Sequence, residues 1–243
     1  HFDGAGNPDN WAGRSAIPGV FIGVPLGLTL MFLGLNRLIG WSRTHPKLLS
    51  IPNKEKFLTL PTATQDRFFN GIKEMMAALA AARQLDLADC WIGAGFIRAK
   101  VWDHLHGYDQ ATALDDVDLL YFQADDITRE SEQALQARLC RALPGPCWSV
   151  KNQARMHERN GTKPYQDIED AMSYWLETPT AVAVRLETDQ TLTIIAPFGL
   201  QDLFDMIIRP TPRGQEVVDQ FEERVARKPW IQNWPRLRVM RHA

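Results

Sequence analysis

The feature that most constrains the fold of this chain is a set of short apolar runs that alternate with helical segments after residue 85. Residues 117–122, VDLLYF, have the length and the apolar content of a buried strand. Other candidate strands are residues 90–93, 148–154, 181–186 and 191–195. The last two predict a hairpin across residues 187–190. Strands mixed with helices in one stretch predict an α/β or α+β fold.

The segments between these runs carry helix patterns. Residues 127–143 are amphipathic and precede Pro144 and Gly145, two residues that end helices. The other predicted helices are residues 65–84, 96–105, 168–176, 201–208 and 215–227. The content of 45% hydrophobic and 23% charged residues is that of an ordinary globular protein. Because the net charge is only −2, the sequence predicts no clear nucleic-acid surface.

Two acidic residues stand at the start of the clearest predicted strand, in residues 114–122, LDDVDLLYF. Since side chains alternate along a strand, Asp116 and Asp118 share one face, about 6.6 Å apart along the strand. Neighbouring carboxylates repel, and a hard divalent cation such as Mg²⁺ or Mn²⁺ relieves that repulsion. We therefore take Asp116 and Asp118 as candidate metal ligands, with a solvated strand end as the alternative.

A glycine turn stands upstream of this strand, in residues 91–105, WIGAGFIRAKVWDHL. The order strand, Gly93-Ala94-Gly95, helix brings backbone N–H groups to a helix N-terminus, where an anion is favoured. Arg98 follows one helical turn later and is placed to reach a phosphate. The alternatives are a turn needed only for packing and a surface arginine.

The glycine turn and the paired aspartates, some twenty residues apart, together resemble the signature of polymerase-β-like nucleotidyltransferases. Further segments occur in order: GAGFIRAKVWDHLHG, DDVDLLYF, NQARMHERNG, APFGLQDLF, RP and WPRLR. Over about residues 86–238 the chain resembles the bacterial nucleotidyltransferase-like family. The resemblance implies a mixed sheet flanked by helices, a triphosphate on the glycine turn, and metal ions on Asp116 and Asp118.

The resemblance also directs attention to later residues. Asn152 and Arg155 are candidate nucleotide-binding residues, because arginine binds phosphate with two parallel hydrogen bonds. The superfamily normally supplies a third carboxylate from a later strand, but the nearest strand carries Asn152. Glu187, at the end of the run AVAVRLE, is the alternative third catalytic acid.

These observations predict a transferase that moves a nucleoside monophosphate from a nucleoside triphosphate to an unknown acceptor. The absence of a secure third acid keeps open a nucleotide-binding or regulatory domain that has lost the reaction. A membrane sensor whose role lies in the N-terminal residues is the third hypothesis.

The N-terminal residues have a different character. Residues 16–35 contain no charge, are apolar all round, and match the roughly 20 residues that cross a bilayer core. We expect one membrane span within residues 16–38, with a buried core segment or a signal-peptide core as alternatives. Positive residues are more frequent after this segment than before it, which predicts a cytoplasmic C-terminal side. They are Arg37, Arg43, Lys47, Lys54 and Lys56, against Arg14 alone.

This organisation predicts two units. Residues 1–75 resemble a fragment of a small uncharacterised bacterial membrane domain, and residues 76–243 form the nucleotidyltransferase-like domain. Because the sequence begins with His1 rather than Met, we expect a fragment, a processed product or a truncated gene prediction. The expected location is the inner membrane with the second unit in the cytoplasm, or the cytoplasm alone if the first unit is artefactual.

Overall fold

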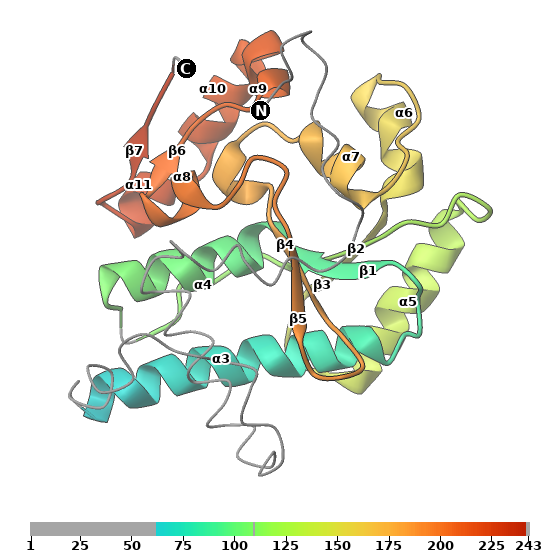
Figure 1. The fold of residues 1–243 in the computed structure, drawn as a ribbon, viewed down its shortest axis with the longest axis horizontal. Coiled ribbons are helices and arrows are strands. Elements are labelled where there is room, and N and C mark those ends of the chain that lie inside the picture. The colour runs from blue at the N-terminus through green and yellow to red at the C-terminus, as the bar shows by residue number, and fades with distance from the viewer. Residues whose placement is uncertain (1–61, 109, 242–243) are drawn as a thin grey trace, which may run out of the picture.

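A computed structural model describes residues 62–108 and 110–241 (Figure 1). The predicted membrane span at residues 16–38 lies outside these residues, and so does most of the predicted membrane-domain fragment. Among the helices that the structure describes, none combines the length and the apolar character that crossing a membrane requires.

The centre of the molecule is one mixed five-stranded sheet. Its order is β3 (Trp148–Asn152), β2 (Val117–Tyr121), β1 (Cys90–Gly93), β4 (Ala183–Leu186) and β5 (Leu192–Ile195). Strands β2 and β3 are parallel, joined by the crossover helix α5 (Arg129–Ala142), and the other neighbours are antiparallel. The mixed sheet and the β4–β5 hairpin confirm the predicted fold class for this part of the chain.

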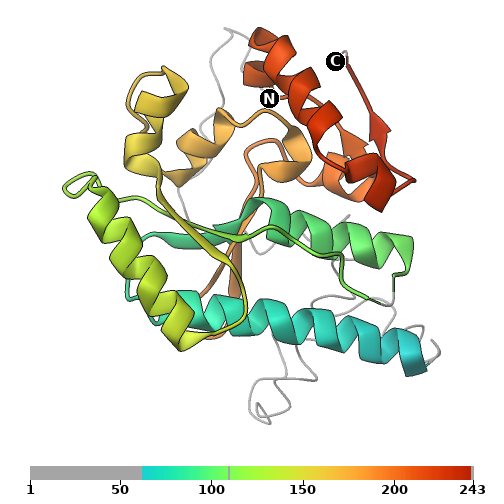
Figure 2. The same ribbon diagram turned by 180° about the vertical axis from the view of Figure 1, so that it is seen from behind.

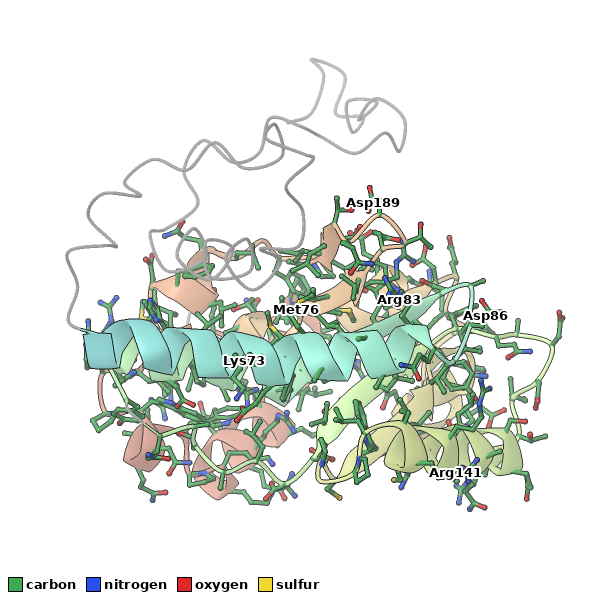
Figure 3. The ribbon with its side chains drawn as sticks, turned by 90° about the horizontal axis from the view of Figure 1, so that it is seen from below. Lys73, Met76, Arg83, Asp86, Arg141 and Asp189 are labelled. Atoms are coloured by element: carbon green, nitrogen blue, oxygen red, sulfur yellow. The ribbon has the colours of Figure 1, made fainter. Side chains whose placement is uncertain are left out.

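The larger hydrophobic core lies between the sheet and the long helices. The helices α3 (Thr62–Arg83) and α5 lie on one side of the sheet, and Figure 3 shows α3 crossing it with Lys73, Met76 and Arg83 along its length. Strand alternation supplies the sheet side of this core, because Val117, Leu119 and Tyr121 all point toward the helices.

The opposite face of the sheet carries a smaller core. Trp91, Leu120 and Ala183 pack there against the short helix α7 (Ile168–Ser173), next to α6 (Met156–Asn160). The view from behind shows α6 and α7 on the side of the sheet away from α3 (Figure 2). Asp118 belongs to this face, since it is two residues from Leu120 along β2.

The C-terminal elements gather above α4 (Ala94–His106), in the upper left of Figure 1. They are α8 (Gln201–Phe204), β6 (Ile207–Ile208), α9 (Pro212–Glu216), α10 (Val218–Arg227), α11 (Trp230–Asn233) and β7 (Arg238–Val239). Trp102 of α4 is fully buried, and its ring meets that of Trp234 edge-on with centroids 5.2 Å apart. The Trp234 indole N–H donates to Asp103 Oδ1 at 2.7 Å, which fastens the C-terminal segment to α4.

The prediction of a helix over residues 201–208 is wrong in its second half. The helix α8 ends at Phe204, Met206 adopts a left-handed φ of 57°, and β6 pairs in parallel with β7. Because the partner strand lies some thirty residues later, the local pattern of apolar residues carried no sign of this pairing.

Candidate active site

Asp118 and the glycine turn lie side by side. In the antiparallel ladder of β1 and β2, Asp118 is the direct partner of Gly93, so their Cα atoms are about 5 Å apart. Asp116 lies just before β2 and is half-buried. The structure thus brings Asp118, one of the two predicted metal ligands, to the predicted phosphate-binding turn, which lies more than twenty residues upstream in the sequence.

The turn has no loop residues, because β1 ends at Gly93 and α4 begins at Ala94. The left-handed backbone is at Ala94, with a φ of 56°, and not at either glycine of the motif. Gly93 is extended, and a Cβ there would lie 3.0 Å from both the Val182 carbonyl oxygen and Leu120 Cδ1. The glycine at position 93 is therefore required for space rather than for its backbone angle.

The N-terminus of α4 has no side-chain cap, and its first N–H group, that of Ala94, donates to the Val182 carbonyl oxygen at 3.0 Å. The N–H groups of Gly95 and Phe96 belong to the first helical turn, so they have no partner within the helix. Backbone N–H groups and the helix dipole at such a terminus favour a bound phosphate.

The electrostatics of Asp118 favour a cation. Burial is the main factor that raises the pKa of its carboxyl to about 6, and the charge of Asp116 adds to the effect. A hydrogen bond from Ser149 and the positive charges of Arg224 and Arg98 act in the opposite direction. The ionised carboxylate is therefore costly at neutral pH, and a bound divalent cation would remove that cost.

The donor set fits Mg²⁺ or Mn²⁺ held jointly with a substrate. Within residues 62–108 and 110–241 no group of three or more His, Cys, Asp or Glu side chains is arranged to hold a metal. Two carboxylates completed by phosphate oxygens and water are a common way for proteins to bind Mg²⁺. Asp116 and Asp118 supply such a pair.

Arg98 lies beneath the turn rather than on the surface. Its residue is 5% exposed, and its guanidinium lies over the rings of Trp230 and Trp102, at 4.7 and 5.1 Å from their centroids. Its Nη1 donates to the Thr180 hydroxyl, and a Cβ placed on Gly95 would lie 3.6 Å from its Nη2. Burial is the main factor that lowers the pKa of Arg98 to about 10, so the side chain remains a cation at neutral pH.

Glu187 is not brought to this site. Ala183 is the β4 partner of Gly93, and Glu187 follows it by four residues, about 13 Å along the strand. Its carboxylate accepts hydrogen bonds from Arg185 Nε at 2.8 Å and from the Thr193 hydroxyl at 2.6 Å. These contacts hold Glu187 at the other end of the sheet, and its catalytic role stays an untested prediction.

Asn152 and Arg155 lie away from the turn as well. Asn152 pairs with Tyr121 at the far end of β2, is fully buried, and bonds to backbone groups of residues 123, 126 and 154. Arg155 forms two hydrogen bonds, of 2.8 and 2.6 Å, with the buried carboxylate of Glu132. Both residues join β3 to its surroundings, and their assignment to nucleotide binding stays a prediction that this geometry does not favour.

Comparison with known proteins decides the family. A family model described as Nucleotidyltransferase matches residues 80–239. The chain belongs to this nucleotidyltransferase family. A solved structure reported as revealing a CCA-adding enzyme head domain is 31% identical, covers 69% of this chain and 90% of its own, and has a TM-score of 0.62.

More distant structures resemble the nucleotidyltransferase only weakly. The Thermotoga maritima CCA-adding enzyme complexed with tRNA has 16% identity and a TM-score of 0.44 over 70% of this chain. A CCA-adding enzyme with CTP has 16% identity and a TM-score of 0.47 over 74%. This chain spans only 39% and 43% of their lengths.

A search of curated proteins found no match. The expectation that the chain has no clear nucleic-acid surface stays a prediction.

Sequence reasoning missed two charged residues of this nucleotidyltransferase, Glu177 and Arg224. Glu177 is 1% exposed, and its Oε1 accepts a hydrogen bond from Arg224 Nε at 2.7 Å. No sequence motif contains either residue, and Arg224 is one of several charged residues on the amphipathic helix α10. What distinguishes Arg224 is its hydrogen bond to the buried Glu177, 47 residues away in the sequence.

Proposed function

We propose that this protein transfers a nucleoside monophosphate from a nucleoside triphosphate to an acceptor in a Mg²⁺-dependent reaction. The observation that carries the proposal is the direct pairing of Asp118 with Gly93. It puts a carboxylate that favours a cation next to a helix terminus that favours an anion. A metal–triphosphate complex satisfies both preferences at once.

Each group of the site has a role in this reaction. Asp116 and Asp118 would hold Mg²⁺, which neutralises phosphate charge and aligns an in-line displacement. The N–H groups of Gly95 and Phe96 donate to phosphate oxygens, and the Arg98 cation stabilises the charge that accumulates on the pyrophosphate. Gly93 lets β1 and α4 pack closely against Val182 and Leu120, which sets the position of this helix terminus.

A second candidate function is nucleotide binding without transfer. The residues in register with Asp118 across the sheet are Ser149, Gly93, Ala183 and Ile195, and none of them is acidic. This row therefore offers no third carboxylate to deprotonate an attacking hydroxyl. The observation favours a regulatory or sensing domain that retains the nucleotide site.

Two measurements on the full chain separate these functions. Isothermal titration with ATP, CTP, GTP and UTP, with and without Mg²⁺, should show magnesium-dependent binding that Asp116→Asn and Asp118→Asn abolish. The control is Asp115→Asn, because the Asp115 side chain is 88% exposed and pairs with Lys228. Pyrophosphate release with candidate acceptors then identifies the transferase, and binding without release identifies the second function. Absence of all nucleotide binding contradicts both.

We further propose that residues 16–38 tether the domain to the inner membrane, with the domain in the cytoplasm. The support is the uncharged apolar segment and the positive charges that follow it. The full chain should sediment with membranes and resist carbonate extraction. A matched variant with Leu28, Leu30 and Leu33 changed to Lys should remain in the supernatant. Equal partition of both proteins would contradict the tether and would favour a cytoplasmic enzyme.

A further inference from the structure

Beside the glycine turn lies a charged cluster in which two arginines share one buried carboxylate. Arg224 Nε donates to Glu177 Oε1 at 2.7 Å. The Thr180 hydroxyl donates to the same oxygen at 2.9 Å and accepts from Arg98 Nη1. Glu177 thus connects one guanidinium from α4 with another from α10, more than a hundred residues apart.

The two guanidinium groups lie against the same aromatic ring. The Arg98 guanidinium carbon is 4.7 Å from the Trp230 centroid, and that of Arg224 is 5.6 Å from it. The Arg98 Nη2 atom would lie 3.6 Å from a Cβ placed on Gly95, so the Arg98 side of this ring adjoins the glycine turn. Arg224 is therefore the neighbour of an arginine that reaches the turn.

The two guanidinium groups of the cluster have hydrogen-bond donors that Glu177 and Thr180 leave unused. Buried polar groups are normally hydrogen-bonded. Arg98 Nε is buried with no hydrogen-bond partner among the described residues. The side chain of Arg224 is 29% exposed, and no described residue accepts a hydrogen bond from its two terminal amino groups. An anion bound at the glycine turn would accept hydrogen bonds from such groups.

We propose that Arg224 is a second polyphosphate-binding residue of the nucleotide site, and that Glu177 is a positioning residue that fixes its orientation. The inference rests on the function proposed above and extends it to a residue from the C-terminal part of the chain. With Nε held by Glu177, the planar guanidinium presents its terminal N–H groups in a fixed direction, as recognition of phosphate requires.

The test compares ligands that differ only in phosphate number. The full chain is titrated with ATP, ADP and AMP in the presence of Mg²⁺, as wild type and as Arg224→Gln. We expect the affinity for ATP to fall roughly 10–100-fold, as for a lost charge-assisted contact, and that for AMP to fall less than about threefold. Arg227→Gln, on the exposed side of the same helix, is the matched control and should leave ATP binding unchanged.

A positioning role for Glu177 is tested through its dependence on Arg224. Glu177→Gln should weaken ATP binding more than AMP binding, and it should cause no further loss in the Arg224→Gln background. Arg224→Gln alone leaves the buried Glu177 carboxylate without its ion-pair partner and with only the hydrogen bond from Thr180. The double variant removes that buried charge, so it keeps the test valid if the single variant fails to fold.

The outcomes separate this inference from the proposed function. If wild type binds no nucleoside triphosphate, both are overturned. If wild type binds ATP and Asp118→Asn abolishes the binding, but Arg224→Gln binds ATP as wild type does, only the role of Arg224 is overturned. Equal losses for ATP and AMP would also overturn it, since they would indicate a structural effect.

Discussion

Replacing Asp118 with Asn should stabilise the metal-free protein while it abolishes nucleotide binding. Burial and Asp116 raise the pKa of Asp118 from 3.8 to about 6. Since a tenfold change in a protonation equilibrium corresponds to about 1.4 kcal/mol, keeping this carboxylate ionised at pH 8 costs the fold about 3 kcal/mol. Asparagine carries no charge, so we expect a gain of about 1–3 kcal/mol, or roughly 2–10 °C in Tm.

The stability gained by Asp118→Asn should depend on pH in a defined direction. A carboxyl whose folded pKa lies above its unfolded pKa costs stability above the folded value, and the cost disappears as the pH falls through about 6 toward 3.8. Thermal unfolding in EDTA should therefore show Asp118→Asn more stable than wild type at pH 8, with the difference shrinking by pH 4.5. Asp115→Asn should show little difference at either pH. A variant no more stable than wild type at pH 8, or a gain independent of pH, would refute the reasoning.

Three further substitutions test the fold around the site. Asn152→Ala should lower the free energy of unfolding by about 3–5 kcal/mol, and Tm by roughly 6–20 °C in a melting experiment, because buried backbone groups lose their partners. Gly214→Ala should cost roughly 1–3 kcal/mol in urea unfolding, since its Cβ would lie 2.2 Å from the Leu176 carbonyl oxygen; unchanged stability would contradict this packing. Tyr121→Phe should leave unfolding unchanged or stabilise the protein by up to about 1 kcal/mol, because the hydroxyl is buried without a partner; a loss above about 1 kcal/mol would reveal a missing contact.

Local patterns in the sequence anticipated much of the fold. The apolar run in residues 117–122 contains β2, and the amphipathic pattern in residues 127–143 contains α5. The hairpin of β4 and β5 forms as predicted across residues 187–190. These elements were predictable because strand alternation, helix periodicity and helix-ending residues act within a few positions of one another.

The placement of Asp118 on the same face of β2 as Leu120 also follows from alternation alone. The position of Asp118 opposite Gly93 does not follow from alternation, because β2 could pair with its neighbour in another register and keep the same local pattern. The same limit applies to Glu187, which looks like a suitable acid in sequence and lies at the far end of β4.

By itself, the sequence determined the types of the main elements, the face of β2 that carries Asp118 and the family resemblance. Only the tertiary structure decided the strand order, the pairing of β6 with β7 and the contact of Glu177 with Arg224. The physical reason is that side-chain periodicity depends on neighbours along the chain. Strand register and buried ion pairs instead depend on which segments, distant in the sequence, pack against each other and bury their side chains.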